Sequence, residues 1–513
     1  MYDLLIIGGG INGTAIARDA AGKGLKVLLC ERDDLAGHTS SASTKLIHGG
    51  LRYLEYYEFN LVRHALAERE VMLRSAPHII WPMRFVLPYD KGLRPAWMLR
   101  TGLFLYDHIG GREMLPGSKS LKLDKAPHKG VLESRFKTGF EYSDCWVDDA
   151  RLVVLYALDA SHRGADIRTR TEVQSVEAAA EGYQVQIKHA GEVETVHAKG
   201  IINSAGPWVD EVLKKIKRTK NEQSLRLVTG SHIVTKKLYE GRHLYMFQNP
   251  DKRIIFAIPY EQDYTLIGTT DEPYKISDGE IKISSKETNY LLNAASEYFA
   301  KPVTKADIVW DYAGVRPLYD NKKQNASAVT RDYVFDLKDE DTPPILSIFG
   351  GKITTYRELA EHALEKLEKH FPKMGGDWTA KAVLPGGDIP DADFDAFLDG
   401  LLSRFRWLEP SVLRRLARAY GTRIEHILGD AKSKSDLGRD FGGGLFEAEA
   451  RYLIKTEWAK TSEDILWRRS KLGLEFTPSE VEELQHYLTS AKSDTEIADV
   501  EENNMEETDQ QSV

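Results

Sequence analysis

The first 31 residues show the apolar pattern of a strand, a turn, a helix and a second strand. Asp3–Ile7 is a mostly apolar run, which predicts a buried strand. The string Gly8-Gly-Gly-Ile-Asn-Gly13 follows, and the spacing of apolar residues over about Ile11–Lys23 predicts a helix. A second apolar run, Leu25–Cys30, predicts another strand and ends at Glu31.

The glycines of the first turn fit the pattern G-x-G-x-x-G. Gly8 allows a tight turn, Gly10 lets a pyrophosphate approach the backbone, and Gly13 lets helix and strand pack closely. The free N–H groups at the helix start favour an anion. Glu31 lies where an acid accepts hydrogen bonds from a ribose. The pattern predicts an adenine dinucleotide and leaves FAD and NAD open.

Three later stretches also bring small or hydroxyl residues to turns. Thr39–Ser43 is a loop of hydroxyl residues and alanine, and Ile201–Trp208 predicts a buried strand that runs into a small-residue turn. Ile345–Phe349, followed by Gly350-Gly351, repeats the order of strand, glycine turn and helix, with the helix ending near His370. We expect the backbone to close on a nucleotide at these turns.

Strand patterns dominate the middle of the chain. A small antiparallel meander is predicted over Val173–Val176, Tyr183–His189 and Glu194–Ala198. A second, antiparallel domain is predicted between about Ser224 and Pro317, with strands at Leu227–Val234, Arg253–Pro259 and Tyr264–Thr269 and an amphipathic helix over 286–301.

Helical patterns occupy the remaining segments. Leu61–Ser75 has helical spacing, Phe371–Asp393 is rich in Pro and Gly and predicts a linker, and the chain from Phe394 to about Ser490 predicts a helical domain. Residues 91–109 are apolar with basic residues between. This pattern fits either a helix packed on the body or a segment lying on an anionic membrane.

Composition narrows the function classes. A chain of 513 residues predicts more than one domain, and only two cysteines argue against a disulfide scaffold. The fingerprint strand starts too early for a signal peptide, and no apolar run approaches the ~20 residues of a membrane span. The formal charge is −9, but residues 493–513 hold eight acids and no Lys or Arg, so the rest is near neutral. Nothing indicates nucleic-acid binding.

Several long strings resemble the FAD-dependent, aerobic and quinone-linked glycerol-3-phosphate dehydrogenases, within the glycine-oxidase-like flavoproteins. The resemblance extends from residue 1 to about 490. It rests on the strings Thr39–Leu54, Gly139–Asp149, Gly230–His232, Gly268–Asp271, Gly314–Leu318, Thr330–Tyr333, Phe349–Arg357, Leu384–Gly387 and Leu466–Lys471.

The resemblance implies an α/β plus α+β fold: a Rossmann-like FAD-binding domain, an antiparallel-sheet substrate domain and a C-terminal helical cap. The predicted boundaries are 1–85, 140–223 and 330–371 for the FAD-binding domain, 86–139 and 224–329 for the substrate domain, 385–490 for the cap and 491–513 for a disordered acidic tail. It also implies a cytoplasmic chain that works at the inner face of the cell membrane. A homodimer is left open.

The implied reaction oxidises sn-glycerol 3-phosphate to dihydroxyacetone phosphate by hydride transfer to flavin N5 and passes electrons to ubiquinone or menaquinone. The residues implied for FAD are Gly8, Gly10, Gly13, Glu31, Thr39, Ser40, Ser41, Ser43, Gly49, Gly50, Leu51, Ala205, Gly206, Gly350, Gly351, Lys352 and Thr354. Those implied for the substrate are Arg52, Tyr53, Thr269, Arg316, Arg331 and Lys352, with His232, Arg316 and Lys352 as catalytic residues.

Residue chemistry supports these roles without settling each one. Arg suits a phosphate through bidentate contacts, and the ordinary pKa of His suits proton removal near neutral pH. His48 is a second candidate for the base. No metal-ligand spacing is present, and Asp148-Asp149 predicts a helix cap. Three alternatives stay open: an oxidase that uses oxygen, an amino-acid oxidase or deaminase, and a flavin-binding scaffold without turnover.

Overall fold

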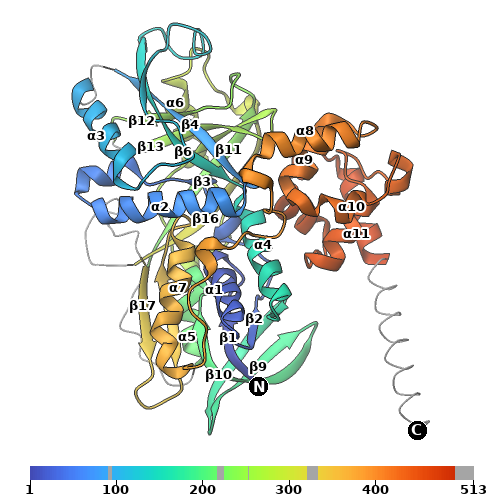
Figure 1. Ribbon diagram of the computed structural model, residues 1–513. Helices are drawn as coiled ribbons and strands as arrows, with labels where there is room; N and C mark the ends of the chain where they lie inside the picture. Colours follow the sequence, from blue (N-terminus) through green and yellow to red (C-terminus); the bar gives the residue numbers. More distant parts are fainter. Residues whose placement is uncertain (91–94, 217–224, 252, 320–332, 491–513) are drawn as a thin grey trace. The chain divides into compact units, whose positions relative to one another are not determined.

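The computed structural model describes residues 1–90, 95–216, 225–251, 253–319 and 333–490 (Figure 1). Arg331 and the predicted acidic tail lie outside these residues. The chain divides into two compact units. The first is Met1–Phe397 with Tyr420–Thr422, and the second is Leu398–Ala419 with the residues from Arg423 onward.

An eight-stranded mixed sheet in the first unit contains the predicted nucleotide-binding segments. β1 pairs in parallel with β2 on one side and β10 on the other, and β10 pairs in parallel with β18. The carboxyl ends of β1, β10 and β18 therefore meet at one edge of the sheet. In order across the sheet, the strands are β17 (Tyr333–Lys338), β18 (Ile345–Gly350), β10 (Glu192–Asn203), β1 (Tyr2–Ile7), β2 (Val27–Cys30) and β7 (Asp166–Arg168), with β9 (Gly182–His189) on β10 and β8 (Thr171–Ala179) on β9.

Strand β10 joins two kinds of sheet. Its first half pairs with β9 antiparallel, from Glu192 to Ala198, and its second half pairs with β1 in parallel, from Ala198 to Asn203. The predicted meander is confirmed. However, its last strand continues unbroken into the buried strand that the sequence pattern had separated from it.

Helices and the meander cover opposite faces of this sheet. α1 (Ile11–Gly22) packs against α4 (Asp149–His162) and α7 (Tyr356–Leu367), and Figure 1 shows the three together beside the parallel strands. On the other face, Leu5 and Ile7 pack with residues of β8, β9 and the short helix α5 (Val209–Lys215). Alternate residues of β1 point to opposite faces, so each layer has its own core.

A ten-stranded sheet forms the second half of the first unit. Its pairs are antiparallel, as predicted, except for the parallel pair β12–β4. The strands in order are β15 (Glu272–Pro273), β11 (Leu225–Lys236), β14 (Tyr264–Gly268), β13 (Ile254–Tyr260), β12 (Leu244–Gln248), β4 (Ile80–Tyr89), β6 (Thr138–Val147) and β3 (Leu46–Ile47), with β16 (Ile308–Tyr319) on β11 and β5 (Lys119–Lys122) on β6. The predicted domain boundaries at 85/86 and 139/140 fall inside β4 and β6, and they stay a prediction.

Three helices accompany this sheet. α6 (Ser285–Ser296) packs Leu291, Leu292 and Ala295 against Ile233 and Ile267 of the sheet. The helix predicted over 286–301 ends at Ser296 in the structure. Beyond its end, the Tyr298 ring stacks on Phe247 with the ring centroids 4.2 Å apart. α2 (Phe59–Ser75) and α3 (Ala96–Ile109) contact one another.

The second unit is helical, as predicted. Within it, Arg415 forms a bidentate ion pair with the buried carboxylate of Glu449, with both N–O distances at 2.7 Å. Its helices are α8 (Phe394–Arg404), which begins in the first unit, α9 (Pro410–Tyr420), α10 (Glu425–Leu428), α11 (Glu447–Thr456), a π-helical turn (Asp464–Arg469) and a helix over 478–490.

A buried ion pair ties the hydroxyl loop to α4. Lys45 Nζ lies 2.7 Å from Asp149 Oδ1, and both side chains are at most 1% exposed. Asp149 Oδ2 also accepts hydrogen bonds from the backbone N–H and Oγ of Ser43. Asp148 is the N-cap of α4, as predicted for this acidic pair, whereas Asp149 holds the loop.

We expect Lys45→Met to lower the free energy of unfolding by about 3–5 kcal/mol, because it leaves the carboxylate of Asp149 buried without its cation. Urea unfolding followed by tryptophan fluorescence measures this. The matched control is Lys199→Met, which breaks an exposed ion pair with Asp3 and should cost about 0–1 kcal/mol. Equal losses in the two variants would contradict the expectation.

Candidate active site

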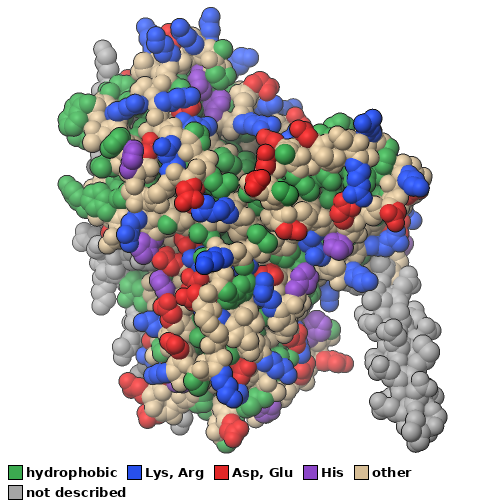
Figure 2. Space-filling model, in the orientation of Figure 1, with side chains coloured by type: hydrophobic (Ala, Val, Ile, Leu, Met, Phe, Trp, Pro, Cys, Tyr) green, Lys and Arg blue, Asp and Glu red, His purple; other side chains and the backbone are tan. Residues whose placement is uncertain are grey.

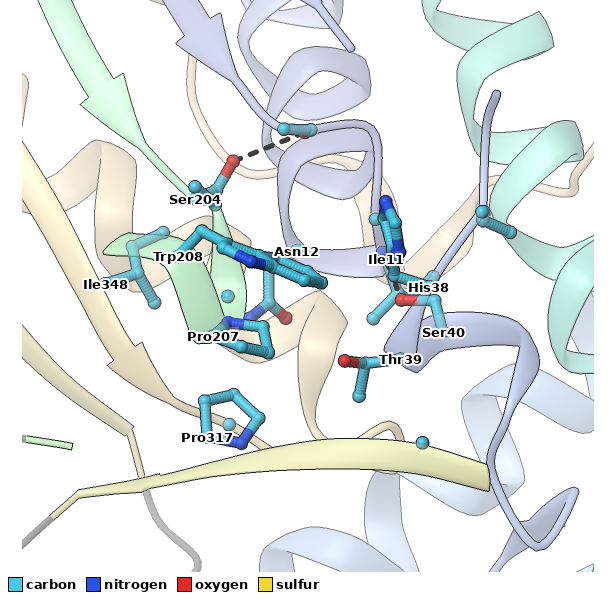
Figure 3. A pocket seen from close by; sticks show the side chains of 18 of the residues that line it. Ile11, Asn12, His38, Thr39, Ser40, Ser204, Pro207, Trp208, Pro317 and Ile348 are labelled. Carbon is cyan, nitrogen blue, oxygen red and sulfur yellow. Dashed lines mark hydrogen bonds between the residues drawn. The ribbon is translucent and has the colours of Figure 1, made fainter. Parts of the chain in front are cut away.

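A cavity of about 450 Å³ opens at the sheet edge where β1, β10 and β18 end. Gly8, Ser204 and Gly350 follow or end these strands and line it. Figure 3 shows side chains from the three segments around one space, with the Trp208 ring reaching across toward the loop of Thr39 and Ser40.

The first bend brings two backbone segments very close. Gly8 has a φ of +113°, which favours glycine. A Cβ added to Gly13 would overlap the carbonyl of Gly8 and Ser204 Oγ, so this position admits no side chain. Ser204 Oγ donates to the carbonyl of Ile7 at 2.9 Å, which joins the second bend to the first.

The start of α1 faces the cavity. Gly10, Ile11 and Asn12 line it, and the N–H of Ile11 donates to Ser40 Oγ at 3.0 Å. Free N–H groups at a helix start carry partial positive charge, so this end suits a pyrophosphate.

Glu31 also lines the cavity. Its carboxylate accepts hydrogen bonds from the N–H of Gly9 at 2.6 Å and of Asp33 at 2.8 Å. Burial raises the pKa of Glu31, while these two N–H groups act to lower it. Nearby, the rings of His38 and Trp208 lie 4.6 Å apart. The predicted contact of Glu31 with a ribose stays a prediction.

The hydroxyl loop contributes unevenly to the cavity. Thr39, Ser40 and Ser43 line it, and Thr39 Oγ1 donates to the carbonyl of Val315 at 2.8 Å. Ser41 is not among the lining residues, because its Oγ bonds back to the carbonyl of His38.

The third bend follows β18. Gly350 and Gly351 have φ values of +83° and +107°, and both line the cavity with Lys352. Lys352 Nζ donates to the carbonyl of His48 at 2.6 Å. A helix was expected to start directly at this turn, but α7 begins only at Tyr356 because residues 352–355 form a separate turn closed by the bond from Thr355 N to Lys352 O.

Arg316 also lines the cavity. Its guanidinium forms an ion pair with Asp271 and donates to Thr269 Oγ1 at 2.8 Å. On neighbouring β11, a Cβ added to Gly230 would overlap the guanidinium and Thr269 Oγ1. The glycine therefore makes room for Arg316.

His232 lies on β11, two residues after Gly230, and is fully buried. Its Nε2 lies 3.0 Å from Thr44 Oγ1, and its ring stacks on Tyr312 at 4.7 Å. Its pKa lies well below the usual value, first because of burial and then because of the positive charges of Arg316 and Lys45. The imidazole is therefore neutral near pH 7, the form that can accept a proton.

The remaining predicted residues surround the cavity without being among its lining residues. Gly50 has a φ of +79° and makes room for the Tyr53 ring, whose centroid lies 5.5 Å from Lys352 Nζ. Thr354 Oγ1 lies 3.4 Å from both the N and O of His48. The predicted residues outside the lining are Gly13, Ser41, Gly49, Gly50, Leu51, Arg52, Tyr53, His232, Thr269 and Thr354.

Sequence reasoning missed residues that shape the site without contacting the cavity. Gly230 makes room for Arg316, and Gly268 does the same for the His232 ring, which an added Cβ would overlap. Glycine inside a strand weakens it and often marks a close approach. That signal was present in both strings. Lys45 gave no comparable signal, because its partner lies 104 residues away.

Comparison with known proteins decides the family. The FAD dependent oxidoreductase family matches residues 3–357, and the C-terminal domain of alpha-glycerophosphate oxidase matches residues 378–494. The aerobic glycerol-3-phosphate dehydrogenase of Escherichia coli is 49% identical over 92% of this chain and 94% of its own length. The chain belongs to the FAD-dependent glycerol-3-phosphate dehydrogenase family.

Two further relatives of this chain bear on its substrate class and its fold. D-erythritol 1-phosphate dehydrogenase of Brucella abortus is 52% identical over 93% of this chain and 96% of its own length. The structure of glycerol-3-phosphate dehydrogenase from Bacillus halodurans, complexed with FAD, has a TM-score of 0.74, 28% identity and coverage of 96% of this chain and 94% of that one. The predicted fold class is confirmed.

The residues around the cavity fit FAD, the cofactor of this protein. Gly8 and Gly13 leave no room for a side chain, the start of α1 faces the cavity, and the buried acid Glu31 lines it. The protein is therefore an FAD-dependent oxidoreductase, and its relatives act on phosphorylated polyols.

We expect Gly230→Ala to lower kcat/KM for the phosphorylated polyol substrate by about tenfold to a hundredfold, because the added Cβ displaces the Arg316 guanidinium. Steady-state kinetics with an artificial electron acceptor measures this. Gly376→Ala is the control, since a Cβ there meets open space. If the Gly230 variant is as active as the control, the Arg316 guanidinium does not depend on the missing side chain at residue 230.

Proposed function

We propose that the protein oxidises sn-glycerol 3-phosphate to dihydroxyacetone phosphate. The observation that carries the proposal is that Arg316 and Lys352, from β16 and from the turn after β18, line the same cavity as the dinucleotide-binding bends. A phosphate with nearly two negative charges needs such fixed cations beside the cofactor. The names of the relatives support the same substrate class.

Arg316 is the proposed phosphate ligand. Asp271 and Thr269 hold its guanidinium, and its side chain is 23% exposed and lines the cavity. We assign Thr269, Arg52 and Tyr53 as further substrate contacts, because Tyr53 lies near Lys352 and Arg52 precedes it. Arg331, also proposed for the substrate, lies outside the described residues.

His232 is the proposed base for the alcohol proton, with His48 as the alternative. The lowered pKa keeps the His232 ring neutral, and Thr44 Oγ1 fixes the direction of Nε2. A positioned base contributes about 10²–10⁴ in rate. Its full burial requires that the proton reach it over a short hydrogen-bonded path, and Thr44, which lines the cavity, lies on such a path.

Lys352 is proposed to act through its charge. His48 O holds its ammonium group at 2.6 Å, in the turn whose glycines are predicted to bind FAD. FAD bound in the cavity would supply the hydride acceptor of the reaction. Lys352 and Arg316 would stabilise the substrate anion and its developing alkoxide.

D-Erythritol 1-phosphate is a second candidate substrate. The observation that favours it is the 52% identity to the Brucella abortus enzyme over nearly the full length of both chains. The two substrates share the phosphate and the secondary alcohol chemistry, so Arg316, Lys352 and His232 would serve either.

Anaerobic mixing with each substrate tests the proposal. We expect glycerol 3-phosphate to bleach the yellow oxidised enzyme stoichiometrically and faster than D-erythritol 1-phosphate. The reverse order would assign the erythritol compound, and persistent colour with both would refute the proposed reaction. Rapid stoichiometric peroxide release in air would indicate an oxidase.

We also propose that electrons pass to a membrane quinone, with α3 resting on the lipid surface. No helix among the described residues is long and apolar enough to cross a membrane. However, α3 exposes Trp97 at 68% and Phe104 at 60%, and Figure 2 shows hydrophobic side chains gathered in this region. Arg100 on the same helix is exposed, and basic residues beside such an apolar face suit an anionic membrane.

We expect the double variant Trp97→Ser with Phe104→Ser to bind anionic phospholipid vesicles about tenfold more weakly, because both rings leave the lipid boundary. Vesicle sedimentation measures the binding. The control replaces Val193 and Val309, exposed valines on other elements, with serine. Equal binding by both double variants would remove α3 from the membrane contact.

A further inference from the structure

A buried carboxylate lies on α6, the helix that contacts β11. Glu287 is 5% exposed and accepts four hydrogen bonds. Its Oε1 accepts from Ser231 Oγ and Thr270 Oγ1, both at 2.7 Å. Its Oε2 accepts from the N–H and Oγ of Ser284, at 2.9 and 2.7 Å.

The two Oε1 partners alternate with site residues. Ser231 lies between Gly230 and His232 on β11, and successive side chains on a strand point to opposite faces. Ser231 therefore faces α6 when its neighbours face the active site. Thr270 likewise lies between Thr269 and Asp271, the two residues that hold Arg316.

Thr270 links the carboxylate to the guanidinium. Its hydroxyl donates to Glu287 and accepts from the N–H of Ser231 at 2.9 Å. Its carbonyl accepts from Arg316 Nη1 at 3.4 Å and from Thr269 Oγ1 at 3.3 Å. Only one residue therefore separates Glu287 from Arg316 in this chain of hydrogen bonds.

Glu287 stays ionised in its buried place. Burial by itself would raise its pKa, but hydrogen bonds from Ser284, Thr270 and Ser231 outweigh burial and lower it. A carboxylate only accepts hydrogen bonds, and all four partners donate. An amide at this position would turn an NH₂ group toward at least one of those donors.

We propose that Glu287 is a positioning residue for Arg316: it fixes the Thr269–Asp271 segment, and with it the guanidinium, against β11. The inference rests on the proposed function, because it gives Arg316 the phosphate. Ser284 and Glu287 also form a capping box at the start of α6. A cap alone does not require the two bonds of Oε1. In the exposed cap at Thr304, Asp307 bonds Thr304 N and Oγ1 through the same oxygen.

Four variants separate positioning from capping. Glu287→Gln disturbs both roles, and Ser284→Ala weakens the cap while leaving the Oε1 bonds. Thr270→Val removes the linking hydroxyl at nearly constant volume, and Thr270→Ser keeps it. For each variant we measure the melting temperature, KM and kcat for glycerol 3-phosphate, and the Kd of inorganic phosphate from the change in flavin absorbance.

We expect Glu287→Gln and Thr270→Val to raise KM and the phosphate Kd about tenfold, with a smaller change in kcat, because the anion meets a displaced guanidinium. Ser284→Ala should lower the melting temperature but keep both constants within about twofold of wild type, since a lost cap affects helix stability. Thr270→Ser should restore wild-type values.

Two results would overturn the inference: unchanged phosphate Kd in Glu287→Gln and Thr270→Val, or an equal rise in Ser284→Ala. Failure of the proposed function is a separate result. If wild-type enzyme does not oxidise glycerol 3-phosphate while its phosphate Kd still depends on Glu287, the substrate assignment falls and the positioning role stands.

Discussion

Three parallel strands that end at one sheet edge impose the geometry on which the site depends. β1, β10 and β18 are paired in parallel, so the bends that follow them converge although they lie far apart in sequence. Close packing there depends on Gly8 and Gly13, where an added Cβ would overlap other backbone atoms, and Gly8 and Gly350 have positive φ. The cavity follows from this backbone arrangement, and ligands of open α/β sheets bind at such carboxyl ends.

The second constraint is that Arg316, Lys352 and Lys45 are each held by other polar groups. Arg316 is held by Asp271 and Thr269, and Lys352 by the carbonyl of His48. Lys45 is held by Asp149, and it helps to keep His232 neutral. Charged side chains that are already fixed by partners move little when an anion binds. Preorganised sites favour a charged transition state in this way.

Sequence patterns predicted the features that depend on neighbouring residues. The strand, glycine turn and helix of residues 3–23, the meander and the strands at β11, β13 and β14 all have local signals, and the structure contains them. The strands β4, β6 and β16 escaped prediction. The run of β6, for example, was not predicted as a strand, although it ends directly before the helix cap predicted at Asp148-Asp149.

Contacts between distant residues could not be predicted from the chain alone. The string Ser284-x-x-Glu287 signals a helix cap, and nothing in it indicates the bonds to Ser231 and Thr270. Ser41 belongs to a hydroxyl loop that was predicted as a whole, yet a local bond to His38 takes it out of the lining. Pairing between elements decides the role of Glu287, and the local conformation of the loop decides that of Ser41; both appear only in three dimensions.

The affinity of the oxidised enzyme for dihydroxyacetone phosphate tests the central claim most directly, because it isolates phosphate binding beside the flavin from turnover. The claim predicts a Kd at least about thirtyfold higher in Arg316→Ala, since a lost partner in a desolvated charge pair costs about 2–5 kcal/mol, with Arg316→Lys in between. The exposed variant Arg135→Ala should match wild type. A Kd in Arg316→Ala equal to that of wild type would contradict the account.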